Sequence, residues 1–402
     1  MSVALLGSRF IAGFEGSTHR RMDGVRLDLV ASTAHDRLAR RDYARMRRLG
    51  ITAARESLRW HLVESERGRY SFEVEAARVE AAAEAGITVV WDLCHFGWPD
   101  HVDAFATDFA DRYAEWAAAA ARFLASRSQA AWFTPQNEIS FLAWAGDRGI
   151  MNPEAAGRGA ELKRQLARGA ILAIDAVRAE VPGARFLHPE PLIHVVANPA
   201  RRHERQDAAQ ARAAQFDAWD MLAGRLAPEL GGSEAHLDVL GANYYPYNQW
   251  VHGDGPLPMN SPRRQRLSTL LAEVHDRYER PIILSETGAE DRIRGRWLRS
   301  VTSEAARAEA RGVPLGGICP YPILNHPGWE DDRHCRNGIW DYAGPRGGRA
   351  AYRPLTRHIL AEQARPDHVR ERRGRPEADR RGVRQTTDAQ SRRTTARGHR
   401  RT

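Results

Sequence analysis

The chain has 402 residues, 42% of them hydrophobic and 28% charged, which is too long for a small module and apolar enough for a sizeable buried core. Its net charge of +9 is concentrated at one end: from Arg365 onward there are 13 Arg against 5 acidic residues, a surplus of 8 that leaves the rest close to neutral. The charge therefore does not indicate a globular domain built to bind nucleic acid.

Short apolar runs alternate with longer segments of helical periodicity along most of the chain. The apolar runs predict strands at 10–14, 51–55, 87–93, 130–135, 184–188, 237–242, 281–284 and 315–319. The periodic segments predict helices at 36–49, 73–85, 108–126, 158–180, 207–226, 263–278, 293–311 and 352–363. Eight strand–helix units in this length favour a closed parallel (β/α)8 TIM barrel in the α/β class.

An open, doubly wound sheet is the main alternative to the closed barrel. Such a sheet usually has a glycine-rich phosphate turn after an early strand. Residues 13–16, with the sequence GFEG, do not fit the GxGxxG pattern. The barrel is therefore the preferred prediction.

The composition changes sharply near residue 365. We expect a single barrel domain at 1–364 and an Arg-rich tail at 365–402, in which apolar residues almost vanish. A segment of that kind buries too little surface to offset its ordering entropy, so we predict disorder. A tail that binds nucleic acid is the alternative, and the absence of interleaved aromatic residues disfavours it.

No targeting or metal-binding signal is visible in the sequence. Residues 1–14 lack a charged segment followed by a long apolar one, and no stretch approaches the roughly 18 apolar residues of a membrane span. The three cysteines, Cys94, Cys319 and Cys335, form no CxxC motif and predict neither a disulfide framework nor a zinc site. We expect a soluble, cytoplasmic protein without membrane association, metal or cofactor.

Polar and aromatic residues follow the predicted strands, at the end where parallel barrels place their active sites. Each of them alone is better explained as a helix cap or loop residue, but their recurrence after six strands favours a site. They are Arg55, Ser57, His95, Asn137, Glu138, Asn243, Tyr244, Tyr245, Ser285, Glu286, Tyr321, Asn325 and Trp329.

Two carboxylates in this ring suggest a specific chemistry. Glu138 and Glu286 lie just beyond buried strands four and seven, where a carboxylate is costly unless it is paired or used. These strands face each other across a barrel. Glycoside hydrolysis needs such a pair, one carboxyl to protonate the leaving oxygen and one to attack the anomeric carbon or activate water.

Five segments, in order, resemble motifs of one enzyme family. RESLRW at 55–60 resembles RFSISW, CHFGWP at 94–99 resembles YHWDLP, TPQNE at 134–138 resembles TFNEP, GANYY at 241–245 resembles GxNYY, and SETG at 285–288 resembles TENG. The chain thus resembles the clan of barrel glycosidases with catalytic Glu residues on strands four and seven. Within that clan it is most similar to glycoside hydrolase family one, the β-glucosidase family.

The resemblance implies a retaining β-glycosidase that acts on a carbohydrate or glycoside. Glu138 would be the acid/base, with a raised pKa, and Glu286 the nucleophile. Asn137 would bind the sugar 2-hydroxyl, and Arg55 and Tyr245 would keep Glu286 ionised.

Four further residues would contact the substrate. His95 would bind a sugar hydroxyl, Trp329 would stack on or border the sugar, and Asn243 and Tyr321 would complete the substrate-binding set. Tyr321 stands where the family has the Trp of WSL.

The positions that bind the sugar hydroxyls in the family carry different residues in this chain. Gly328 stands where the family's strand-eight Glu grips the sugar 4- and 6-hydroxyls, and His19 and Arg20 occupy the region of its strand-one Gln. We therefore do not name the sugar. Arg20, Arg21 and the acidic run at 330–332 suggest a charged, amino or otherwise decorated glycoside.

Other interpretations stay open. The barrel is alternatively a sugar-binding protein that has lost hydrolysis, or a transglycosylase that uses the same intermediate. His188, Glu190 and His194 follow strand five and are either residues of the mouth or loop residues behind it.

Overall fold

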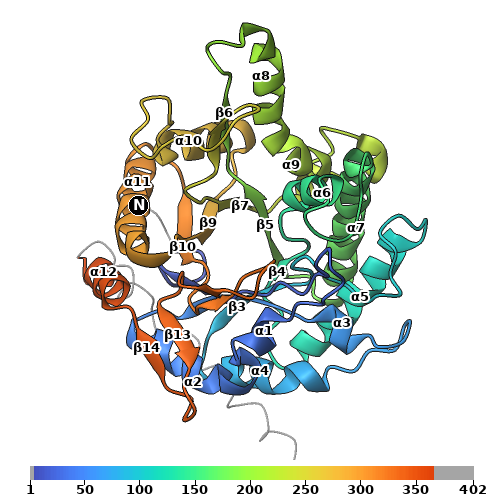
Figure 1. The fold of residues 1–402 in the computed structure, drawn as a ribbon. Coiled ribbons are helices and arrows are strands. Elements are labelled where there is room, and N and C mark those ends of the chain that lie inside the picture. The colour runs from blue at the N-terminus through green and yellow to red at the C-terminus, as the bar shows by residue number, and fades with distance from the viewer. Residues whose placement is uncertain (1–3, 366–402) are drawn as a thin grey trace, which may run out of the picture.

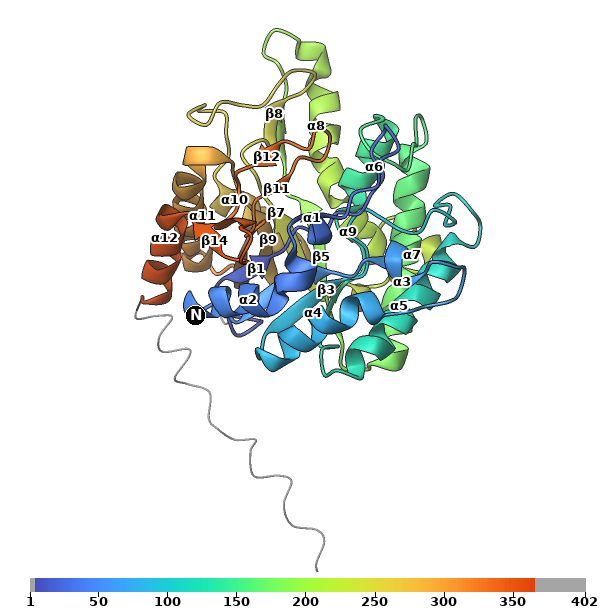
Figure 2. The ribbon, with the colours of Figure 1, turned by 60° about the horizontal axis from the view of Figure 1, so that its bottom comes forward.

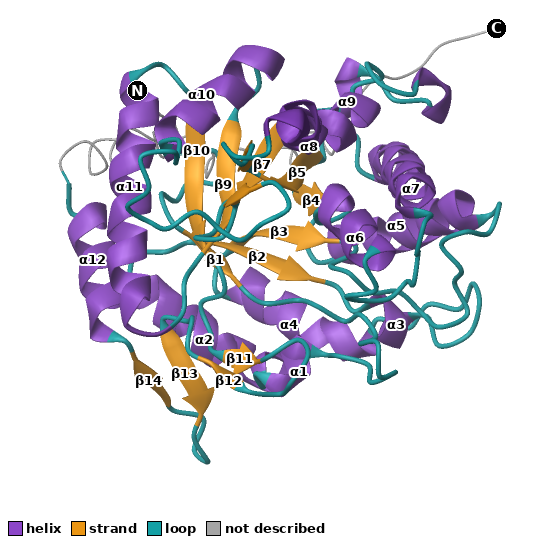
Figure 3. Ribbon diagram, turned by 45° about the horizontal axis from the view of Figure 1, so that its top comes forward, coloured by secondary structure: helices purple, strands orange, loops and turns teal. Residues whose placement is uncertain are grey.

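The computed structural model describes residues 4–365, and its core is a parallel eight-stranded sheet curved into a nearly closed barrel (Figures 1 and 3). The strand order is β1-β2-β3-β4-β5-β7-β9-β10, and a parallel bridge between Phe10 and Ile318 joins the first strand to the last. The strands are β1 (Ile11–Gly13), β2 (Ala53–Ser57), β3 (Thr88–Asp92), β4 (Trp132–Thr134), β5 (Arg185–Pro191), β7 (Val239–Asn243), β9 (Ile282–Thr287) and β10 (Leu315–Pro320). The predicted barrel is confirmed, with every strand where the apolar runs placed it.

An outer layer of helices surrounds the strands (Figure 1). It contains α2 (His35–Arg48), α4 (Glu73–Glu84), α5 (Phe109–Ala125), α7 (Gly159–Glu180), α10 (Leu267–Tyr278), α11 (Arg294–Ala310) and α12 (Arg353–Gln363), each close to its predicted bounds. Within residues 4–365, no helix has both the length and the apolar character needed to cross a membrane. Apart from Arg365, the predicted tail lies outside the described residues.

The prediction of one helix at 207–226 is wrong. The segment breaks into α8 (Arg205–Ala213) and α9 (Asp217–Leu222), joined by a 3-10 turn at Ala214–Phe216. The buried side chain of Gln215 in this turn donates to Arg212 O at 3.0 Å and accepts from Ile193 N at 3.1 Å. The bond from Ile193 ties the break to the chain just after β5.

Short elements that the sequence did not predict lie in the connections between strands and helices. They are α1 (Leu29–Ser32), α3 (Trp60–Val63), α6 (Ile139–Asp147) and three two-stranded pairs: β6 (His194–Val196) with β8 (Gln249–Val251), β11 (His326–Pro327) with β12 (His334–Cys335), and β13 (Trp340–Ala343) with β14 (Arg349–Ala351). In Figure 2, α6, β8, β11 and β12 lie towards the same end of the molecule. This is the end to which the polar strand termini point.

Strand alternation separates two apolar layers. Val90 and Ile283 belong to a cluster inside the barrel, whereas their neighbours Trp91 and Leu284 pack against the helices. The same alternation directs inward the polar residues that continue each inner row: Arg55, Asp92, Asn243, Ser285 and Tyr321. The barrel is thus apolar at its base and polar at its C-terminal end.

A buried network of charges joins this barrel to its helices. Glu56 of β2 faces outward and accepts bonds from His35 Nε2 at 3.0 Å, from Tyr43 and from Arg78. Burial by itself would raise the pKa of Glu56, but the charges of His35 and Arg78 outweigh it and hold the pKa at about 2. The network therefore depends on an ionised Glu56 and links β2 to α2 and α4.

We expect Glu56→Gln to lower the free energy of unfolding by about 3–5 kcal/mol, because it removes the one carboxylate within residues 4–365 that pairs with both buried cations and leaves His35 only Asp42 and Arg78 only Glu75. Urea denaturation measures the loss. Since folding lowers the pKa of Glu56 from its ordinary 4.5 to about 2, its contribution is complete above that ordinary value and is lost as the pH falls towards 2.

The matched control is Glu84→Gln, which breaks the exposed surface pair with Arg40. That change should cost less than about 1 kcal/mol. Equal losses in both variants would contradict the structural role of the buried network.

Candidate active site

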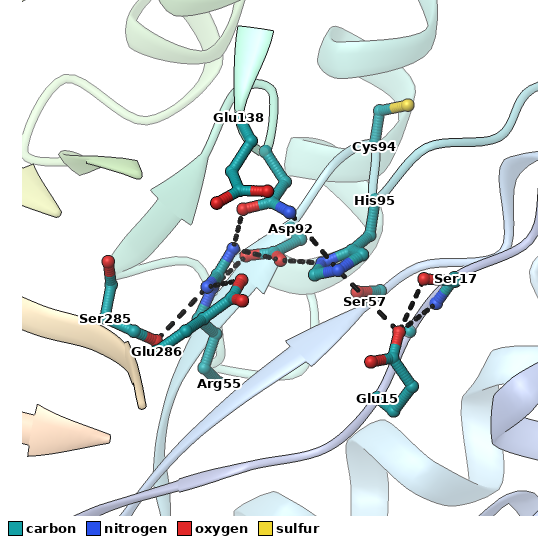
Figure 4. Close-up of polar contacts among 12 residues, drawn as sticks. Glu15, Ser17, Arg55, Ser57, Asp92, Cys94, His95, Glu138, Ser285 and Glu286 are labelled. Carbon is teal, nitrogen blue, oxygen red and sulfur yellow. Dashed lines mark hydrogen bonds and ion pairs between the residues drawn. The ribbon is translucent and has the colours of Figure 1, made fainter. Parts of the chain in front are cut away.

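The C-terminal end of the barrel is organised around the buried guanidinium of Arg55 in β2 (Figure 4). Its Nε and Nη2 bind the Asp92 carboxylate at 3.0 and 2.8 Å, and its Nη1 binds Glu286 Oε1 at 2.7 Å. Nη2 also donates to Asn137 Oδ1 at 2.6 Å. Burial opposes the charge, but Asp92 and Glu286 raise the pKa of Arg55 well above its usual value. The cation therefore joins β2, β3, β9 and the segment after β4.

Glu286 is held by donors from β2 and from the segment after β7. In addition to the bond from Arg55, the Tyr245 hydroxyl donates to Glu286 Oε2 at 2.8 Å. Burial, and then Glu286 itself, raise the pKa of Tyr245 well above its usual value, so the phenol retains its proton. An irregularity in the pairing of β9 with β7 places Glu286 opposite Asn243, which explains how it follows an inward Ser285 and still faces the site.

Glu138 lies in a different environment, four residues after the end of β4 and directly before α6. Its only hydrogen bond within residues 4–365 through the carboxyl group is the one it accepts from Asn243 Nδ2 at 2.9 Å. The Asn243 Oδ1 atom in turn accepts from Ser285 Oγ at 2.6 Å. Burial, and then the charge of Glu286, raise the pKa of Glu138 well above its usual value. Glu138 is therefore the carboxyl of this pair suited to carry a proton.

His95 forms one wall of the site. Its Nδ1 lies 2.9 Å from Asp92 Oδ2, and because a carboxylate only accepts, the ring donates there. Its Nε2 faces Asn137 Nδ2 at 3.2 Å and the Tyr321 hydroxyl at 3.3 Å. Tyr321 also stacks on the His95 ring, with centroids 5.7 Å apart. Gly13 is required beside it, since a Cβ there would lie 2.3 Å from the Tyr321 ring.

Trp329 lies at the rim and joins the site by packing rather than by hydrogen bonds. Its ring contacts His19 at 5.2 Å, Phe96 at 5.7 Å and Phe141 at 6.3 Å between centroids. Eight more of the predicted residues form one hydrogen-bonded set that is connected through Ser285: Arg55, His95, Asn137, Glu138, Asn243, Tyr245, Glu286 and Tyr321. Three predicted residues do not join it: Tyr244 accepts from Gln249, Asn325 donates to Asp341, and Ser57 Oγ has no hydrogen-bond partner within residues 4–365.

Two members of the site were missed from the sequence. Asp92 ends β3 and binds both Arg55 and His95. Glu15 lies two residues after β1 and is buried. It accepts from Ser17 N at 3.0 Å and Ser17 Oγ at 2.5 Å, and its Oε1 lies 3.8 Å from His95 Nε2. The position directly after a strand, which identified the other residues, was an available signal for Glu15.

Glu15 is an ionised carboxylate in the wall of the site. Burial would raise its pKa, but the charges of His95 and His326, together with the Ser17 bonds, lower the pKa below its ordinary value. Within residues 4–365, its second carboxylate oxygen, Oε2, takes part in no hydrogen bond. That oxygen is a candidate acceptor for a ligand.

The contacts at the rim do not favour the hypothesis that Arg20, Arg21 and the acidic run at 330–332 bind a charged substrate. Arg20 pairs with Asp100, and Arg21 pairs with Asp23 and with Asp332 at 3.1 Å. These charges neutralise one another on the surface. Glu15, rather than His19 or Arg20, is the residue of this region that lies beside His95.

His188 lies behind the site rather than at its mouth. It shares the outward face of β5 with Phe186, which packs in the core under the helices. Burial lowers the pKa of His188 to about 3, so the ring is neutral. His194, in β6, belongs to the small sheet with β8.

Gly328 lies in the turn between β11 and β12 and presents no side chain there. Gly328 follows β11 and donates its N–H to Arg333 O at 2.8 Å. A Cβ there would lie 2.2 Å from Asp331 Oδ1, so a larger residue requires that loop to shift. Within residues 4–365, no group of three or more His, Cys, Asp or Glu side chains is arranged to hold a metal ion.

Comparisons with known proteins support the fold. No protein-family model matches the sequence, and no curated protein matches it. Among solved structures, the AHE enzyme from Alicyclobacillus herbarius is 19% identical with a TM-score of 0.74, covering 90% of this chain and 99% of that chain. A β-glucosidase from Thermotoga maritima in complex with glucoimidazole is 15% identical with a TM-score of 0.70, covering 91% and 98%. The chain therefore has the barrel fold of known β-glucosidases, over nearly their whole length.

The environment of Glu138 predicts a protonated carboxyl at pH 7. We expect the infrared difference between the wild type and Glu138→Gln to contain a carboxylic-acid C=O band, since burial and Glu286 oppose ionisation. Glu161→Gln is the control, because Glu161 is exposed and its bond from Arg158 lowers its pKa. A carboxylate band lost in both variants would contradict the assignment.

Proposed function

We propose that the protein is a retaining β-glycosidase of the type found in family one, with Glu138 as acid/base and Glu286 as nucleophile. The observation that carries the proposal is the unequal environment of two buried carboxyl groups at one barrel end. Glu286 accepts from a guanidinium and a phenol, whereas burial and the charge of Glu286 raise the pKa of Glu138. Unequal environments of this kind assign acid and nucleophile in glycoside hydrolysis.

In the first step, a Glu286 oxygen attacks the anomeric carbon as the glycosidic bond breaks. Glu138 gives its proton to the departing oxygen, so the aglycone leaves as a neutral alcohol. In the second step, Glu138 takes a proton from water while the water oxygen displaces Glu286. The sugar is released with its original configuration, and both carboxyl groups return to their starting states.

The surroundings fit this cycle. Arg55 and Tyr245 neutralise and orient Glu286 before the attack, and their bonds are released from it as the ester forms. Asn137, held between Arg55 and His95, is placed for a sugar hydroxyl near the reacting centre. The likeness in fold to β-glucosidases supports the same reaction class.

We further propose that the side chains that bind the glycone differ from those of the family pattern. His95, Asn243 and Tyr321 are polar contacts for the sugar, and Trp329 borders it at the rim. Glu15 supplies the carboxylate acceptor on the β1 side, while Gly328 has none to offer on the β11 side. Acceptors placed in this way suit sugar hydroxyls or an ammonium group, and they disfavour a glycone that carries its own carboxylate.

Intact-protein mass spectrometry with 2-deoxy-2-fluoro β-glycosides that carry good leaving groups tests the proposal. We expect a mass gain of one glycosyl unit that is absent in Glu286→Gln, because this step forms a covalent ester on Glu286. Binding of sugar without any adduct, across a panel of sugars, would favour the alternative of a non-hydrolytic sugar-binding barrel.

The role of Glu138 is tested through the leaving group. We expect Glu138→Gln to lower the glycosylation rate about 10²–10⁴-fold for an alkyl glycoside and far less for a dinitrophenyl glycoside, whose departure needs no proton. Single-turnover kinetics measure both rates. Equal losses with the two leaving groups would argue against acid catalysis by Glu138.

The role of Glu15 is tested through sugar preference. We expect Glu15→Gln to lower kcat/KM for the best neutral glycoside and to reduce discrimination against the matching uronoside, since it removes a negative charge from the wall. Competition between the two substrates measures the ratio. Asp100→Asn, which removes an exposed rim charge paired with Arg20, is the control and should leave the ratio unchanged.

A further inference from the structure

We propose that Glu190, at the end of β5, is a positioning residue for Glu138: it caps the helix that Glu138 begins, and this leaves the Glu138 side chain free to face the reacting centre. This inference rests on the proposed function. It concerns the face of β5 behind the site, where Glu190 is buried.

The backbone at Glu138 is held in an uncommon conformation. Glu138 is the residue before α6 and has φ 42° and ψ 63°, a left-handed geometry that costs a non-glycine residue about 1–2 kcal/mol. Its N–H donates to Pro189 O at 3.1 Å, which fixes the turn to β5. This conformation turns the chain sharply from the end of β4 into a helix.

A residue in this position normally uses its side chain to cap the helix, and Glu138 does not. The first N–H groups of a helix have no partners within it. The Glu138 carboxyl makes no bond to them and instead accepts from Asn243 of β7. Another acceptor is therefore needed for the N–H groups in the first turn of α6.

Glu190 performs that task from the neighbouring strand. The Ser140 N–H donates to both Glu190 oxygens, at 3.1 and 3.3 Å. A carboxylate at a helix N-terminus is also favoured by the helix dipole. Glu190 lies on the same outward face of β5 as Phe186 and His188, so it reaches α6 without entering the sugar site.

Charge adds a second effect to this geometry. Glu138 is faced by Glu286 from β9, Glu190 from β5 and Arg55 from β2, and Glu190 is one of the two carboxylates that raise its pKa. Burial raises the pKa of Glu190 itself to about 7, against the opposing influence of its bonds from Ser140 and the charge of Lys163 on α7. As Glu190 becomes ionised, it opposes loss of the proton from Glu138.

The experiment is the pH profile of kcat/KM for an aryl β-glycoside in wild type, Glu190→Gln and Glu190→Ala. Glu190→Gln keeps an acceptor for Ser140 but removes the charge. We expect the basic limb, where Glu138 loses its proton, to move to lower pH by about 1 unit, while activity on the acid side stays within a few-fold of wild type. Glu190→Ala removes the cap as well, and we expect kcat to fall about tenfold or more at all pH values with little change in KM.

Two further measurements separate failure of this inference from failure of the proposed function. Covalent labelling by a dinitrophenyl 2-fluoroglycoside should persist in both variants, because Glu286 is intact and that leaving group needs no acid. Glu161→Gln, which removes an exposed acid from the first turn of α7, should leave the profile unchanged. Absence of labelling in the wild type would overturn the function itself.

The inference is overturned if the Glu190→Gln profile superimposes on that of wild type while labelling is retained. It is also overturned if Glu190→Ala lowers the single-turnover glycosylation rate equally for alkyl and dinitrophenyl glycosides, since misplacement of the acid should affect only the former strongly in that step. Should the Ala variant fail to fold, the Gln variant alone decides.

Discussion

A buried guanidinium must be surrounded by its counter-charges, and at Arg55 this requirement holds the site together. Its donors are distributed over Asp92, Asn137 and Glu286, which belong to three other parts of the barrel. Each of these groups would be costly to bury alone. The positions of β2, β3 and β9 are therefore coupled, and the site can form only when the barrel has closed around this one cation.

The same charge gives two chemically identical groups different surroundings. Glu286 lies against the cation, whereas Glu138 lies against an amide and is influenced more by burial and by Glu286 than by Arg55. Around them, Asp92 orients His95, and Glu190 accepts from the Ser140 N–H in the first turn of α6. Preorganised partners of this kind make the difference between the carboxyl groups a property of the fold.

Some elements of the fold could be predicted from the sequence, and others could not. The strands and most outer helices were predictable because burial leaves a local apolar pattern. The helix at 207–226 was not, since a buried Gln215 bond to the chain after β5 interrupts it. Nor was α6, which is short and begins at a strained Glu138 whose cap comes from β5. These features depend on hydrogen bonds between segments that are distant in the sequence, and such bonds produce no periodic pattern of apolar residues.

The sequence by itself determined the order of strand–helix units and the polar residues that end the strands, because periodicity records which side of each element is buried. It also placed Glu138 and Glu286 beyond opposite strands. Only the tertiary structure decided their partners: Arg55 meets Glu286, which lies 231 positions further along the chain, and Glu15 after β1 lies close to His95 after β3. Charge pairing acts through space after closure, so local spacing along the chain does not encode it.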